Sequence, residues 1–388
     1  MLANKYNCTG CLACIDICSR RAIKKYMAND GHVYVRINEN LCVECGKCER
    51  LCNTIHSCYG INDKSQSKPY AAWANDFSYR KRGTSGGLFA ALASSFIQNG
   101  GVVVSSLFDG FHAKHIIISD EKDIEALQGS KYVQSDTEGI YKKIDECLNY
   151  KKVLFFGVGC QCAAIRSYFL NHPYSENIYI VDMVCGGVPS SLLISKFRIK
   201  NPTVERITSY RNKRKYELRG LIGNQEVLFQ SKNLPLTGFQ VGQTYRYSCN
   251  NCMYAKIHRK TDLTIGDLWG SRQFSAEDYS NGVSLVISHS VRGEELIKSA
   301  DIFITPIDWD SCLPYNTRIY NGKRINGVLR KKLGFYAQKF DNEKFRKVYT
   351  FDLKPSDGFW YLYMCYWKLR KRFSGKIKKL INVGNNMF

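Results

Sequence analysis

Long hydrophobic runs are absent from this 388-residue sequence. No uninterrupted apolar stretch approaches the roughly 18 residues that a membrane-spanning helix needs. The opening residues, MLANKYNCTG, also lack the apolar core of a secretory signal. We therefore expect a cytoplasmic protein. In that compartment, the 17 cysteines indicate metal ligands and free thiols rather than a disulfide framework.

Two common nucleotide-binding motifs are missing as well. The sequence contains no G-x4-G-K-S/T motif, which argues against P-loop chemistry. A strand-like run leads into Gly157 and Gly159, but Cys162 stands where the third glycine of G-x-G-x-x-G belongs. A classical Rossmann dinucleotide site is therefore not expected.

Acidic residues are scarce, with 34 Asp and Glu against 56 Lys and Arg and a formal net charge of +22. No zinc finger, RNP-like aromatic stretch or recognition helix accompanies this charge, which argues against a nucleic-acid partner. An acidic redox protein, an anionic cofactor or a membrane surface explains the charge equally well.

The sequence does contain a repeated cysteine run, C-x2-C-x2-C-x3-C, at residues 8–18 and again at 42–52. This spacing is typical of a loop that holds a 4Fe-4S cube with three thiolates and sends its fourth cysteine into the next helix. Zinc sites, the alternative, usually pair two short knuckles across a longer gap. In two-cluster proteins the fourth cysteine of each run ligates the other cube. The predicted sets are Cys8, Cys11, Cys14 and Cys52 for one cube, and Cys42, Cys45, Cys48 and Cys18 for the second.

This segment resembles bacterial two-cluster ferredoxin modules, and CSRRAIKKY is similar to the helix that leaves their fourth ligand. One feature departs from the pattern. The proline that usually follows the fourth cysteine is replaced by Ser19 in the first run and by Asn53 in the second. The hydrogen bonding of both cubes, and with it their potentials, should therefore differ. Paired cubes are what a one-electron relay requires.

The chain is long enough for two or three domains. The polar segment NDKSQSKP at 62–69 indicates a linker. Beyond it, strand-like and helix-like segments alternate, beginning with a strand in PYAAWAND and a helix in SGGLFAALASSFIQNGG. This alternation predicts a mixed α/β body. The expected fold is a ferredoxin-like module, a mixed α/β body and a basic helical tail.

The tail has a distinct composition. Residues 358–388 contain no Asp or Glu, and seven Lys or Arg fall between 368 and 379, after the aromatic-rich GFWYLYMCYW. A basic helix headed by aromatic residues can lie on an anionic membrane surface. The alternatives are a solvated helix whose aromatic residues pack on the body, and a docking element for a partner.

Four further cysteines lie in three separated segments of the body. Two of them follow strand-like runs, and two form a Cys-x-x-Cys pair in SCNNCMYA. Convergence on a third metal site and burial as ordinary small hydrophobic residues are both consistent with the spacing. The four residues are Cys160, Cys185, Cys249 and Cys252.

From about Pro69 to Pro306 the chain resembles the beta subunit family of coenzyme F420 (deazaflavin) hydrogenases and dehydrogenases. The stretches that carry this resemblance are TSGGLFAAL, GSKYVQSD, GVGCQCAAIRSYF, DMVCGGVPS, SCNNCMYA and RKTDLTIGDLWG. The family element GTPCQ stands here as GVGCQ, without its Thr and Pro. The resemblance implies an FAD-containing α/β body and a third 4Fe-4S cluster on the four body cysteines. The implied domains are 1–62 (ferredoxin-type), 68–148 and 150–312 (N- and C-terminal beta subunit domains) and 313–388 (variable basic tail).

Several residues of the body fit a flavin. The TSGG turn opens a helix whose free N–H groups suit a pyrophosphate, although a simple Ser/Thr N-cap explains it too. Lys131 could bind a phosphate or a flavin carbonyl, and Tyr132 could stack on a ring. The alternative is that their segment is an ordinary loop without a ligand. Trp269 could cover a ring, or could simply follow a strand into a tight turn. The candidate flavin contacts are Thr84, Ser85, Gly86, Gly87, Lys131, Tyr132, Asp267 and Trp269.

Iron–sulfur clusters carry single electrons, whereas nicotinamide and deazaflavin carriers deliver hydride, so a flavin is needed to join them. We therefore expect an oxidoreductase that passes electrons between a hydride carrier or small substrate, FAD and 4Fe-4S clusters. One alternative is a ferredoxin-linked reductase in surface polysaccharide or other metabolism. A second is a non-enzymatic electron-transfer subunit of a larger complex. The expected partners are a redox protein or ferredoxin and a small-molecule hydride carrier.

Overall fold

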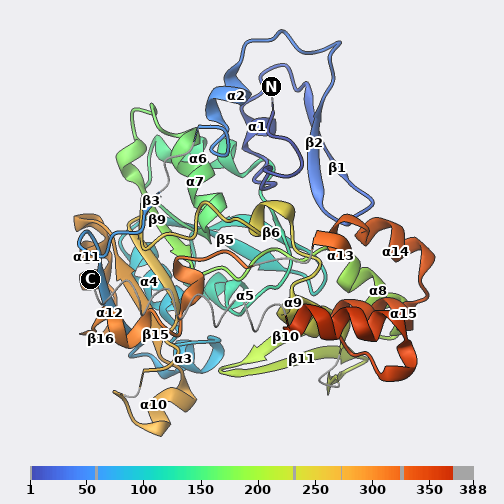
Figure 1. The fold of residues 1–388 in the computed structure, drawn as a ribbon. Coiled ribbons are helices and arrows are strands. Elements are labelled where there is room, and N and C mark those ends of the chain that lie inside the picture. Colours follow the sequence, from blue (N-terminus) through green and yellow to red (C-terminus); the bar gives the residue numbers. More distant parts are fainter. Residues whose placement is uncertain (1, 57–59, 230–232, 272, 324–326, 370–388) are drawn as a thin grey trace, which may run out of the picture.

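The computed structural model describes residues 2–56, 60–229, 233–271, 273–323 and 327–369. Figure 1 shows a mixed α/β body with the cysteine-rich N-terminal module at one end and a group of helices from the end of the chain at one side. The mixed α/β architecture expected from the sequence is confirmed. No helix among the described residues is long and apolar enough to cross a membrane.

The N-terminal module combines an antiparallel strand pair with two short helices. The helices occupy the same place in both cysteine runs, since each begins one residue before the third cysteine and ends before the fourth. The predicted helix after Cys18 is wrong, because residues 23–27 form a strand that pairs with 33–37 from Ile23↔Ile37 to Met27↔Val33. The elements are α1 (Ala13–Asp16), β1 (Ile23–Met27), β2 (Val33–Ile37) and α2 (Lys47–Leu51).

The described residues of the body form a nine-stranded mixed sheet. Its central strands β14, β9, β8 and β5 are parallel, as expected where helices connect the strands. The outer strands are mostly antiparallel. In spatial order the strands are β16 (Ile302–Pro306), β4 (Lys68–Ala74), β15 (Ser284–Ser288), β14 (Leu263–Asp267), β9 (Ile178–Met183), β8 (Val153–Val158), β5 (Val102–Phe108), β6 (Ala113–Ile118) and β7 (Ser135–Asp136).

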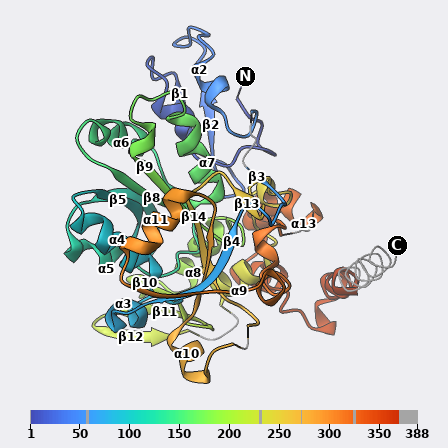
Figure 2. The ribbon, with the colours of Figure 1, turned by 90° about the vertical axis from the view of Figure 1, so that its left-hand side faces the viewer.

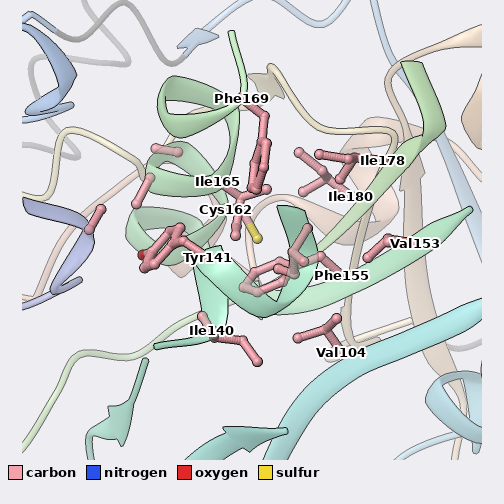
Figure 3. Packing of buried hydrophobic residues seen from close by; sticks show 14 of the residues in the cluster. Val104, Ile140, Tyr141, Val153, Phe155, Cys162, Ile165, Phe169, Ile178 and Ile180 are labelled. Carbon is pink, nitrogen blue, oxygen red and sulfur yellow. The ribbon is translucent and has the colours of Figure 1, made fainter. Parts of the chain in front are cut away.

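Alternating strand residues build a core on each face of the sheet. Val153 and Phe155 of β8 pack on one face, and Leu154 and Phe156 pack on the other, as the two-residue period of a strand requires. Figure 3 shows the first face, where Cys162, Ile165 and Phe169 of the covering helix meet the strands. That face is covered by α6 (Ile140–Leu148) and α7 (Gly159–Tyr168), and the other by α4 (Leu88–Gln98), α5 (Ile124–Leu127) and α11 (Val291–Ser299).

A smaller layer lies beside the main sheet. A three-stranded antiparallel sheet packs on two helices through a separate apolar core. Its elements are β10 (Arg206–Asn212), β11 (Lys215–Ile222), β12 (Gln225–Leu228), α8 (Leu192–Lys200) and α9 (Leu234–Val241). The remaining elements are α3 (Phe77–Arg82), α10 (Ala276–Asn281), α12 (Trp309–Cys312), α13 (Gly327–Lys331), α14 (Leu333–Lys339), α15 (Asn342–Thr350) and the strand pair β3 (Gly60–Ile61) with β13 (His258–Arg259).

Candidate functional site

The two N-terminal cysteine runs exchange their last members. Burial raises the pKa of the Cys11 thiol to about 11, and the neighbouring thiols of Cys8 and Cys52 add to that shift. The Cys14 thiol likewise lies within electrostatic reach of Cys11, Cys8 and Cys52, and more weakly of Cys48. In the second run, Cys18 contributes to the raised pKa of Cys48. The structure thus places Cys52 with the first run and Cys18 with the second, in the predicted grouping. Ligation itself stays a prediction.

The four body cysteines also come together. Burial raises the pKa of Cys160, and the thiols of Cys185, Cys252 and Cys249 raise it further. Cys160 lies in the first turn of α7, Cys185 follows β9, and the other two belong to one loop. Backbone N–H groups point at two of the sulfurs, from Gly187 to Cys185 Sγ at 3.3 Å and from Val188 to Cys249 Sγ at 3.4 Å. Such N–H···S bonds stabilise cluster thiolates and tune potentials.

These thiols would have to lose their protons to bind metal, since the thiolate is the ligand. Burial raises the pKa of Cys185 to about 12 and that of Cys249 to about 11, so cluster assembly there would release protons. Among the described residues, no three His, Cys, Asp or Glu side chains converge closely enough to hold a single ion. The cysteines of a cube, by contrast, each bind a different iron atom.

Asn53, which replaces the usual ferredoxin proline, links two of these groups. Its side-chain amide donates to the Cys160 carbonyl at 3.0 Å, and its side-chain oxygen accepts from the Tyr254 hydroxyl at 3.2 Å. The Asn53 side chain is buried. A proline could make neither contact. The departure from the ferredoxin pattern therefore places a hydrogen-bonding bridge between the first cube's cysteines and Cys160.

Further hydrogen bonds hold the first cysteine loop against the body. The carbonyl of Cys11 accepts from Thr137 Oγ1 and from the Tyr141 hydroxyl, both at 2.7 Å. The buried Arg246 donates to the Cys8 carbonyl at 3.2 Å. Cys45 of the second run is exposed. The first run therefore faces the body, and the second has an edge open to solvent.

A large cavity lies between the main sheet and the smaller layer. It has a volume of about 650 Å³, within the range of small-molecule and cofactor sites. Cys160 and Cys185 line it, and it reaches Thr9 and Gly10 of the first cysteine loop. Its lining contains four Lys or Arg and a single acid, Asp267. The cationic members are Lys131, Arg211, Arg318 and Lys323.

The first turn of α4 opens into this cavity. Its N-cap is Gly87, at φ +79°, and no side chain caps the helix. A Cβ at Gly87 would lie 2.8 Å from backbone atoms of Arg80, so the close turn needs glycine. The Ser/Thr N-cap alternative is therefore wrong, and the first-turn N–H groups lie at the wall formed by Gly87, Leu88 and Phe89.

Gly86 was a candidate flavin contact, and the structure corrects this prediction. Its N–H donates to Ser284 Oγ at 2.9 Å, and its carbonyl accepts from the Ala74 N–H at 2.7 Å. A Cβ at this position would lie 2.7 Å from the Ala72 carbonyl oxygen. Gly86 does not line the cavity, whereas Thr84 and Ser85 do. Its glycine serves packing against the sheet and not the approach of a ligand.

Lys131 and Tyr132 line the cavity, but both already have partners. The Lys131 ammonium donates to the carbonyls of Leu127, Gln128 and Gly129 at 2.8 to 3.0 Å, at the end of α5. Burial lowers its pKa to about 8. The Tyr132 ring stacks on Phe239 with centroids 3.8 Å apart. Lys131 can therefore lend charge to a ligand, while one face of Tyr132 is already covered.

Arg211, at the end of β10, is a residue that the sequence reasoning missed. It donates to both Asp267 oxygens, at 2.8 and 3.1 Å, and to the Thr84 carbonyl at 3.4 Å. Its guanidinium lies 5.6 Å from the Trp269 ring centroid. Asp267 and Trp269, two of the predicted flavin contacts, thus line the cavity. Arg211 neutralises the charge of the Asp267 carboxylate. No motif marks Arg211, since its segment, SYRNKRKYELRG, looks only like a cationic hairpin.

The cavity wall suits an anionic ligand. The first turn of α4 has no side-chain cap, and four Lys or Arg against one Asp line the cavity. A helix N-terminus with positive charge around it attracts phosphate groups. FAD carries an anionic pyrophosphate, so the residues present fit it.

Family models match three parts of the chain. Residues 7–55 match a 4Fe-4S dicluster domain, 69–141 match the N-terminal part of the coenzyme F420 hydrogenase/dehydrogenase beta subunit, and 150–303 match its C-terminal part. The cysteine runs and the α/β body define an iron–sulfur protein of the oxidoreductase class that transfers electrons. The chain belongs to the coenzyme F420 hydrogenase/dehydrogenase beta subunit family, which confirms the resemblance found in its sequence.

Among solved structures, the chain is similar to a chain of the F420-reducing NiFe hydrogenase complex from Methanosarcina barkeri, studied with xenon. The identity is 18%, the match covers 71% of this chain and 90% of that chain, and the TM-score is 0.48. A comparison with curated proteins finds no match.

Proposed function

We propose that this chain is an iron–sulfur flavoprotein that exchanges hydride with a small carrier at FAD and passes single electrons to three 4Fe-4S clusters. One observation carries the proposal. The same 650 Å³ cavity has an uncapped helix turn in its wall, two of the four body cysteines in its lining, and the first cysteine loop at its edge. A cofactor bound there would adjoin the predicted third cluster, as electron transfer requires.

The chain's own residues would bind and orient the cofactor. The first-turn N–H groups of α4, next to Gly87, would donate to its pyrophosphate, and the helix dipole adds to that attraction. Lys131 and Arg318, which line the cavity, supply positive charge. When bound, FAD supplies the exchange between two-electron and one-electron chemistry.

The cavity wall on the opposite side positions and shields the ligand. Arg211 ties the β10–β11 hairpin to Asp267 and to the Thr84 carbonyl, so the hairpin covers the turn before α4. Lys213, at the hairpin tip, donates to the carbonyls of Gly83 at 2.7 Å and Ser85 at 3.4 Å. These contacts limit the entry of water from that side.

The spatial order of the cysteine groups supports an electron-transfer path from the body to the N-terminal module. Cys160 and Cys185 lie at the cavity, Cys11 lies within electrostatic reach of Cys160, and Cys14 within reach of Cys48. Electrons would therefore pass from the body cluster to the first cube and then to the second. Exposed Cys45 marks the edge where a redox protein would receive them.

Anaerobic purification with iron, sulfide and flavin quantified tests the proposal. It predicts about twelve irons and one FAD per chain, four irons for each cube. Stopped-flow reduction with reduced deazaflavin or NADPH then distinguishes an enzyme from a relay. If no flavin is bound after purification or titration, the hydride chemistry is wrong, and a relay subunit without its own substrate remains. Reduction by ferredoxin alone would favour the ferredoxin-linked reductase.

A further inference from the structure

The last described helix, residues 359–369, exposes a row of large hydrophobic side chains. The helix belongs to the red end of the chain, which stands away from the main body in Figure 2. The exposed residues are spaced by three, four and three positions, which places them on one face of a helix. More than half of each side chain is exposed. The row consists of Phe359, Leu362, Tyr366 and Leu369.

The opposite face of this helix is already packed. The Trp360 ring meets Tyr336 of α14 and Phe340, the residue after α14, edge-to-face, with centroids 5.3 and 5.8 Å apart. Met364 is buried on the same side. The helix is therefore fixed to the protein by one face, so its apolar row is not needed for docking to the body. The alternative in which the aromatic residues of the tail pack on the body holds for Trp360, but not for the exposed Phe359 and Tyr366.

The segment on which this helix packs has an excess of cations. Residues 327–358 contain eight Lys or Arg and four Asp or Glu. Arg330 is buried and pairs with Asp30, and each of the four acids is also engaged within the protein. Asp341 caps α15, Glu343 and Asp352 pair with Arg346, and Asp357 pairs with Lys347.

The excess of Lys and Arg over Asp and Glu continues toward the C-terminus. No acid occurs from 358 to 388, and seven Lys or Arg fall between 368 and 379. Residues 370–388 lie outside the described part of the structure, so only their composition enters here.

We propose that the face formed by Phe359, Leu362, Tyr366 and Leu369 docks on an anionic membrane surface. An apolar row bordered by cations is the pattern by which a helix lies at the headgroup boundary of such a membrane. A second copy of this chain is disfavoured as the occupant, because its like charges would meet across the contact. This inference is independent of the flavin and the clusters.

Vesicle co-sedimentation of the full-length, cluster-loaded protein tests the proposal. The vesicles contain either 30% phosphatidylserine in phosphatidylcholine or phosphatidylcholine alone. Wild-type protein should sediment with the anionic vesicles, and high salt should weaken that binding, because salt screens surface charge. Leu362→Glu should weaken the partition about tenfold or more, since it removes a Leu that would be buried in the membrane and adds a charge that the anionic lipids repel. Lys368→Gln should weaken it about fivefold.

Leu170→Glu is the matched control. Leu170 and Leu362 are both 67% exposed, but Leu170 lies just after α7, away from the proposed face. Equal iron content and thermal melting would show that both variants fold. The proposal is overturned if wild-type protein ignores anionic vesicles or if both Glu variants bind equally. It is also overturned if light scattering shows that Leu362→Glu only dissociates a dimer, which would make a second copy the occupant.

Discussion

The Arg211–Asp267 pair offers the most direct test of how the cavity is held. Arg211 is 6% exposed and Asp267 21%, and both carboxylate oxygens accept from the guanidinium. Removing one member of a buried pair costs about 3–5 kcal/mol, because it strands the other charge. Since Asp267 keeps some contact with water, we expect Arg211→Met to cost about 3 kcal/mol, the low end.

Hydrogen exchange of the β10–β11 hairpin is the appropriate assay, because a cluster-bound multidomain chain does not unfold in two states. A loss of about 3 kcal/mol corresponds to roughly 150-fold faster exchange of the hairpin amides. Flavin affinity should fall with it, since Arg211 also fixes the Thr84 carbonyl. Asp267→Leu combined with Arg211→Met should be milder than Arg211→Met alone, because no buried carboxylate is left unpaired.

Arg219 provides the control within the same sheet. It pairs with Glu217 and Glu226 at 3.3 and 3.2 Å, but these side chains are one-quarter to one-half exposed. Surface pairs of this kind contribute about 0–1 kcal/mol. Arg219→Met should therefore change hairpin exchange less than fivefold. If the two Met variants accelerate exchange equally, the argument from burial is refuted.

Three further outcomes follow from the site. Cys160→Ala should remove about four irons, as expected for one cube, and leave the EPR signals of the N-terminal cubes intact; loss of all the iron would contradict separate sites. Burial lowers the pKa of Lys131 to about 8, so its charge is present below that pH and lost above it. Flavin affinity, measured by fluorescence titration, should then fall as pH rises through 8, and a Lys131→Met variant with an unchanged pH profile would disprove this role. Gly86→Ala should lower the melting temperature with or without flavin, because its Cβ would lie 2.7 Å from the Ala72 carbonyl oxygen; a variant that loses only flavin affinity would return Gly86 to the binding site.

Features with local chemical patterns could be predicted from the sequence. The repeated cysteine spacing predicts which thiols group together, because in two-cluster proteins the fourth cysteine of each run belongs to the other cube. The strands 69–76 and 151–159 and the helix after Gly87 also follow from local periodicity, and the structure has them as β4, β8 and α4. The domain limits at 62, 148 and 312 stay predictions.

The errors share a physical origin in contacts between distant residues. Gly86 looked like part of a phosphate-binding turn, but Ser284, 198 positions away, takes its N–H. Arg211 and Asp267 are 56 positions apart and belong to no motif. The resemblance to ferredoxin modules predicts a helix after Cys18. Residues 23–27 form a strand instead, because they pair with the strand 33–37.

Asn53 is a residue for which the sequence and the structure give complementary information. The sequence shows only that the usual proline is missing, and the structure shows what its replacement does. Its amide bonds to the Cys160 carbonyl at 3.0 Å, across the boundary between the cysteine module and the body. Cys160 is a predicted ligand of the body cluster and Cys52 a predicted ligand of the first cube. Because Asn53 follows Cys52 directly and bonds to the Cys160 carbonyl, it provides a covalent and hydrogen-bonded route between the two predicted sites. A proline at this position has no side-chain donor and could not make that connection.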